Sequence, residues 1–208
     1  MRLGFNEAND RFCQGHTVMQ DLELCEKYGF DCIDIQSECL NRDLEKGIVT
    51  IEELGAWFAT HHLKMLSYNA LCFFNMKQTA EEKQAVMDEL DEIIRRCNIL
   101  GCKMIVVVPS QDMKARGLQP TRKEIREDAV AVLKEMVKKV EPHGIKLSLE
   151  FCGAPDMTIN RFEDAYAIVE AVDSPLVGVT LDQYHFYAMG SGWESLEKAD
   201  GKKIFVWH

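Results

Sequence analysis

The sequence of 208 residues has no long apolar run and fewer basic than acidic side chains. No segment approaches the roughly 18 apolar residues of a membrane-spanning helix, and the N-terminus becomes polar too early for a signal peptide. The 24 Lys and Arg against 34 Asp and Glu give a formal net charge of −10, which argues against binding to nucleic-acid phosphates or anionic lipid. We therefore expect a cytoplasmic protein with no nucleic-acid partner and no membrane attachment.

The sequence also lacks paired cysteine motifs and a flexible linker. Eight cysteines are present, but none forms a Cys-x-x-Cys motif. In a chain of this length without a secretory signal, we expect reduced thiols that pack as small apolar residues. No stretch rich in Pro, Gly or Ser divides the chain, so we expect a single domain over residues 1–208.

Short apolar segments alternate with amphipathic segments along the whole chain. The strand-like segments are Arg2–Phe5, Cys32–Gln36, Lys64–Asn69, Lys103–Val108, Lys146–Phe151, Val177–Leu181 and Lys203–Trp207. Most are apolar on both faces, as is typical of parallel strands covered on both sides. Expected N-caps of the intervening helices are Thr17, Thr50, Thr79, Thr121 and Asn160, each with Glu or Gln three residues later.

Seven strands that alternate with helices predict an α/β fold of the (β/α)8 TIM-barrel type. A doubly wound sheet is less favoured, because no Gly-x-Gly-x-x-Gly follows the first strand. The eighth βα unit is missing from the chain, so we expect an incomplete barrel, truncated at its C-terminal end, from a longer enzyme.

Three consecutive strands end in a residue that can bind a metal ion: Glu150, Asp182 and His208. Reactive groups of such barrels lie at the carboxyl ends of the strands, and neighbouring strands are about 4.8 Å apart. The three side chains can therefore converge on one divalent ion, for which Mn²⁺, Co²⁺, Mg²⁺, Fe²⁺ and Zn²⁺ are all suitable. Each could instead be an ordinary solvated residue, but three such roles would leave clustered charges without a counter-ion.

Other polar residues accompany the strand ends. His185 lies three residues after Asp182, and we expect it to contact a substrate hydroxyl or to move a proton. An ordinary loop histidine is the alternative. Glu7 and Asn69 follow the first and third strands and are predicted to orient polyol hydroxyls, with turn capping as the alternative.

Four segments resemble those of the xylose isomerase-like TIM barrels, and among them the inosose (2-keto-myo-inositol) isomerases most: Phe5–Ala8, Leu147–Phe151, Leu181–Ser191 and Asp200–His208. The resemblance implies one divalent metal ion held by Glu150, Asp182 and His208, and a second glutamate on an eighth strand that this chain does not contain. It also implies that Glu150 is an acid/base group and that His185 contacts the substrate.

We therefore expect a metal-dependent isomerase that shifts a carbonyl between adjacent carbons of a sugar or polyol through an enediolate. A ketohexose 3-epimerase and an inosose dehydratase share that intermediate and are the enzymatic alternatives. A DNA-repair enzyme of the AP-endonuclease type is disfavoured by the acidic charge and by strand ends at 68–69 and 109–110 without histidine. A non-catalytic sugar-binding barrel and association into a homo-oligomer are left open.

Overall fold

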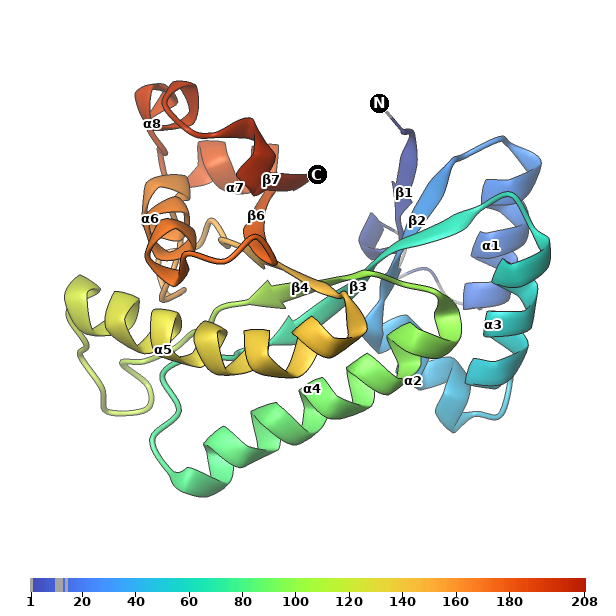
Figure 1. Cartoon of the computed structure of the whole chain (residues 1–208), viewed down its shortest axis with the longest axis horizontal. Helices are drawn as coiled ribbons and strands as arrows, with labels where there is room; N and C mark the ends of the chain where they lie inside the picture. Colours follow the sequence, from blue (N-terminus) through green and yellow to red (C-terminus); the bar gives the residue numbers. More distant parts are fainter. Residues whose placement is uncertain (1, 10–12, 14) are drawn as a thin grey trace. The chain divides into compact units, whose positions relative to one another are not determined.

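The computed structural model describes residues 2–9, 13 and 15–208 (Figure 1). Its seven strands form one sheet in the order of the sequence. They are β1 (Gly4–Asn6), β2 (Cys32–Gln36), β3 (Lys64–Cys72), β4 (Met104–Val108), β5 (Lys146–Glu150), β6 (Val177–Leu181) and β7 (Ile204–Trp207). All seven strands predicted from the sequence are thus confirmed, and the α/β barrel topology with them.

Helices follow the strands, as the amphipathic segments predict. They are α1 (Val18–Lys27), α2 (Ser37–Glu45), α3 (Ile51–Thr60), α4 (Ala80–Leu100), α5 (Arg122–Val140), α6 (Phe162–Val172), α7 (Gln183–Ala188) and α8 (Trp193–Glu197). Among the helices that the structure describes, none combines the length and the apolar character needed to cross a membrane.

Reciprocal capping boxes begin four of these helices. The N-caps Thr17, Thr50, Thr79 and Thr121 each accept a backbone N–H three residues ahead, and the Glu or Gln there accepts the cap's own N–H. The fifth prediction is wrong, because α6 begins after Arg161 without a side-chain cap. Nδ2 of Asn160 instead donates to the carbonyl of Ala154 at 3.0 Å, a bond that holds this side chain within the loop.

The chain forms two compact units. The first comprises Met1–Ala70 and Glu92–Ile105, and the second comprises Leu71–Asp91 and Val106–His208. In the first unit β1, β2 and β3 pair in parallel. A single barrel domain over the whole chain stays a prediction.

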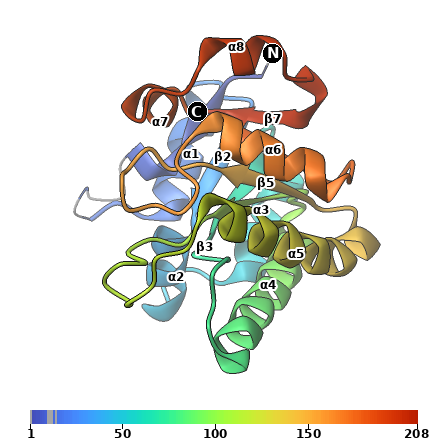
Figure 2. The same cartoon turned by 90° about the vertical axis from the view of Figure 1, so that its left-hand side faces the viewer.

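The second unit contains β5, β6 and β7, which also pair in parallel. Helices α5 and α6 lie side by side, and α6 packs against β5 and β6 (Figure 1, Figure 2). Strand residues between these layers are fully buried, among them Leu147, Leu149, Val177 and Val179. This packing holds the carboxyl ends of β5 and β6 at one edge of the sheet.

All eight cysteines are free thiols, as predicted. Five of them are buried and behave as small core residues. Cys13 and Cys72 are exposed, so the expectation of a core position holds for most of them and not for all.

Asn75 ties together three loops of the second unit. Its side chain is fully buried, its Oδ1 accepts the N–H of Ser110 at 2.7 Å, and its Nδ2 donates to Oγ1 of Thr158 at 3.2 Å. The N–H of Thr158 in turn donates to the carbonyl of Ser110 at 2.9 Å. The loop that starts after Glu150 is therefore fixed to the loops that follow β3 and β4.

Replacement of Asn75 by Ala is expected to lower the free energy of unfolding by about 2–4 kcal/mol, because it leaves a buried N–H unpaired and opens a cavity. Urea denaturation of the two proteins measures this change. The exposed amide of Gln119 in the loop after β4 offers a matched control, and we expect Gln119→Ala to change the stability by less than about 0.5 kcal/mol. Equal effects of the two substitutions would contradict the conclusion that the side chain of Asn75 holds the three loops together.

Candidate active site

Glu150 ends β5 and is only 7% exposed. Side chains alternate along a strand, so Ser148 shares its face of the sheet. The hydroxyls of Ser148 and Thr180 are hydrogen-bonded, with their oxygens 2.6 Å apart, and both residues are fully buried. This bond joins β5 to β6 directly beneath Glu150 and Asp182, and so fixes the spacing of the two carboxylates.

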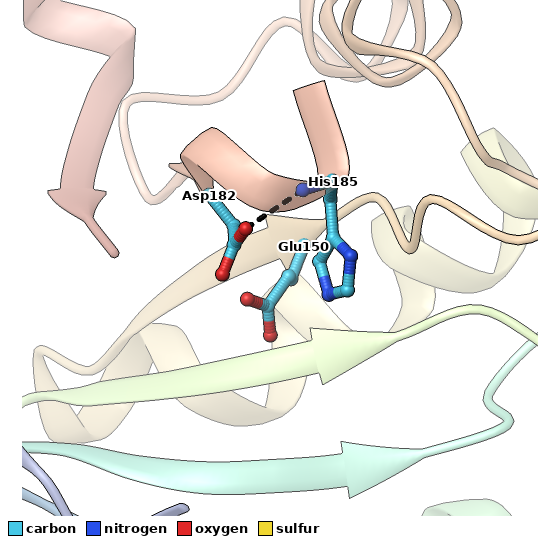
Figure 3. A group of neighbouring side chains, drawn as sticks. All are labelled: Glu150, Asp182 and His185. Atoms are coloured by element: carbon cyan, nitrogen blue, oxygen red, sulfur yellow. Dashed lines mark hydrogen bonds between the residues drawn. The ribbon is translucent and has the colours of Figure 1, made fainter. Parts of the chain in front are cut away.

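Asp182 follows β6 and caps α7. Its Oδ1 accepts the backbone N–H of His185 at 2.8 Å (Figure 3). This cap turns the chain so that the imidazole of His185 comes beside the carboxylate of Glu150 (Figure 3). One metal-binding atom from each of these three residues lies within 4.8 Å of the others.

His208 contacts this group through Glu150. Its Nδ1 lies 3.2 Å from Oε1 of Glu150, and both side chains are largely buried. Two backbone bonds hold His208 in place: its N–H donates to Leu181 at 2.9 Å, and its carbonyl accepts the N–H of Gln183 at 3.1 Å. Of the three predicted strand-end residues, Glu150 and Asp182 thus lie in one group with His185, whereas His208 joins this group through its contact with Glu150.

The donor set fits a divalent cation. Two carboxylates and imidazole nitrogens are ligands that Zn²⁺, Mn²⁺, Co²⁺ and Fe²⁺ accept. Within the described ranges, Nδ1 of His185 is buried without a hydrogen-bond partner, which is unfavourable for a polar atom. A cation with an open coordination position would satisfy it.

Cys152 lies next to the group and was not predicted from the sequence to take part in the site. Burial, and then the negative charge of Glu150, raises the pKa of its thiol, with smaller contributions from Cys72 and Asp182. The thiol is therefore neutral. No spacing motif marks this cysteine in the sequence, because its position depends on how the loop folds back.

The two residues predicted to orient hydroxyls belong to the first unit. Glu7 is fully buried, and its Oε2 accepts the N–H of Gln36 at 2.7 Å. Asn69 is 7% exposed, and its Nδ2 donates to Oδ1 of Asn6 at 3.5 Å. Both side chains thus form hydrogen bonds with polar groups at the carboxyl ends of neighbouring strands among β1, β2 and β3. Their contact with a substrate stays a prediction.

Comparison with known proteins shows to which family the chain is related. Residues 22–208 match the family model described as xylose isomerase-like TIM barrel. An inosose isomerase of Bacillus velezensis is 40% identical over 208 residues, which cover 100% of this chain and 71% of that protein. An inosose isomerase of Bacillus subtilis is likewise 40% identical, with 100% and 72% covered.

A solved structure agrees with these relatives. The 1.8 Å crystal structure of IOLI protein with a bound zinc atom superposes with a TM-score of 0.92 at 41% identity, over 100% of this chain and 72% of that one. The sequence match over most of the chain and the shared fold lead to one conclusion: the chain belongs to the xylose isomerase-like TIM-barrel family.

Proposed function

We propose that this isomerase moves the carbonyl group of an inosose, such as 2-keto-myo-inositol, to the neighbouring carbon by way of an enediolate. The observation that carries the proposal is the convergence of Glu150, Asp182 and His185 within 4.8 Å of one another. The inosose isomerases that match the whole chain at 40% identity support the choice of substrate.

The reaction requires two proton transfers at carbon and one between oxygens. In an inosose, the carbon next to the carbonyl carries a hydrogen and a hydroxyl group. Removal of this hydrogen as a proton gives the enediolate, and return of a proton to the former carbonyl carbon leaves the carbonyl on its neighbour. No atom is gained or lost, so the reaction needs no redox cofactor.

We assign removal of the proton to Glu150. Its carboxylate is held at the end of a buried strand and oriented by the contact with His208, so little reorganisation is needed when the substrate binds. Glu150, Asp182, His185 and His208 would hold a divalent cation, which supplies positive charge beside the carbonyl oxygen and so favours the enediolate. The zinc atom in the related IOLI structure supports zinc as this cation.

We assign the transfer between the two oxygens to His185. With one ring nitrogen of His185 on the cation, the other would remain free to exchange a proton with the two oxygens. The bond from its backbone N–H to Asp182 fixes the position of the ring relative to Glu150 (Figure 3). Glu7 and Asn69 are proposed to orient the ring hydroxyls of the substrate.

Product analysis tests this function and separates it from the enzymes that share the enediolate. The purified chain is incubated with Zn²⁺ or Mn²⁺ and with inososes or ketohexoses, and the products are identified by ¹³C NMR. We expect an inosose with a shifted carbonyl carbon. An inverted C3 in a ketohexose would instead indicate an epimerase, and loss of water from the inosose would indicate a dehydratase.

A further inference from the structure

Gly153 lies where the loop after β5 meets α7. A Cβ atom at this position would lie 2.7 Å from the carbonyl oxygen of His185 and 2.8 Å from its Cα. Carbon atoms in good contact are about 3.5–4.0 Å apart, so only glycine allows this approach. The contact joins the segment that follows Glu150 to the backbone of His185.

The loop side of this contact is held by its own hydrogen bonds. The N–H of Cys152 donates to the carbonyl of Ile159 at 3.2 Å, and that of Met157 donates to Ala154 at 3.2 Å. The side chain of Asn160 donates to the same carbonyl of Ala154 at 3.0 Å. The loop therefore cannot yield to an added methyl group without breaking bonds next to Glu150.

The helix side is held equally firmly. The backbone N–H groups of His185 and Phe186 donate to Asp182 at 2.8 and 2.9 Å. The ring of Phe186 is 5% exposed and lies 5.9 Å from the ring of Phe162 and 4.9 Å from that of Trp193. A methyl group at position 153 therefore displaces the helix or the loop as a body, and either movement changes the spacing of His185 and Glu150.

We propose that Gly153 is a positioning residue, whose missing side chain sets the separation between Glu150 and His185 and so the geometry of the metal-binding group. The part of this proposal that concerns turnover rests on the proposed function. The part that concerns binding of the metal ion does not depend on which reaction the protein catalyses.

The test compares Gly153→Ala with two other glycine substitutions. In Gly55→Ala the new Cβ would lie 2.7 Å from the carbonyl oxygen of Ile99, a matched clash in α3 of the first unit. In Gly201→Ala the new Cβ would meet nothing within 4 Å. The affinity of each metal-free protein for Zn²⁺ is measured by calorimetry at a temperature at which circular dichroism shows all of them folded.

We expect Gly153→Ala to raise the Kd for Zn²⁺ at least about tenfold, as loss of a group that orients metal ligands does, and to lower kcat more than it raises KM. Gly55→Ala should lose stability but bind Zn²⁺ like the wild type, and Gly201→Ala should change neither. A Kd for Gly153→Ala equal to that of the wild type would overturn the proposal, since a merely structural glycine would lower stability alone.

A second variant covers the case in which Gly153→Ala does not fold. The Cβ of the exposed Ala188 lies 3.0 Å from the position of the added methyl group, so Ala188→Val presses on the same contact from the helix. We expect it to raise the Kd for Zn²⁺ about threefold, and an unchanged Kd would overturn the proposal. If the wild type fails to isomerise inososes while these affinities still fall, the proposed function is wrong and the positioning role stands.

Discussion

Glu150→Gln is expected to lower kcat for 2-keto-myo-inositol by about 10³-fold or more, because the amide has the shape of the carboxylate but cannot accept a proton from carbon. Turnover is followed by NMR, and circular dichroism checks that the variant is folded. Glu150 is the buried member of the metal-binding group, so the loss of its charge also weakens that group. Loss of the base and weaker binding of the metal ion both lower kcat.

The exposed Glu170 on α6 provides a matched control for this substitution. Glu170→Gln removes the same charge from the same unit of the chain, and we expect its kcat to equal that of the wild type. A kcat for Glu150→Gln within about tenfold of the wild-type value would show that another group removes the proton.

Removal of the metal ion is the second change that we expect to lower turnover strongly. Dialysis against a chelator should reduce turnover by about 100-fold or more, since the developing negative charge on oxygen is then uncompensated. Addition of about one equivalent of Zn²⁺, Mn²⁺ or Co²⁺ should restore it. The metal content is measured by atomic emission before and after dialysis.

Asp182→Asn tests the same role of the metal ion by removal of one ligand charge. Asn is as good an N-cap as Asp, so α7 and the bond from Asp182 to the N–H of His185 should be preserved. The variant loses a ligand charge, however, and should need much more metal for the same turnover. Full turnover by a wild-type protein shown to be free of metal would contradict the proposed role of the cation.

The strands, four of the eight α-helix starts and the three strand-end residues could be predicted from the sequence, because they depend on local patterns. Glu150, Asp182 and His208 each follow a short apolar run, and parallel strands present their carboxyl ends at one edge of a sheet. The same reasoning was wrong at Asn160, because a local capping motif does not reveal that the loop uses the amide for its own bond to Ala154.

The role of Gly153 could not be predicted from local sequence patterns. Its backbone does not have the positive φ that would require glycine, so no turn motif identifies it in the sequence. The need for glycine arises only when the loop after β5 and the backbone of His185 come together in the folded unit. Residues that set distances between elements in this way are found from the structure.

The central claim is that the group around Glu150 transfers a proton at the carbon next to the carbonyl of an inosose. The most direct measurement is to incubate the metal-loaded protein with 2-keto-myo-inositol in D₂O and to locate deuterium in the product by NMR. The account predicts an inosose with a shifted carbonyl that carries solvent deuterium at the former carbonyl carbon, and no such product with Glu150→Gln. The same shifted product, formed by Glu150→Gln at the rate of the wild type, would contradict it.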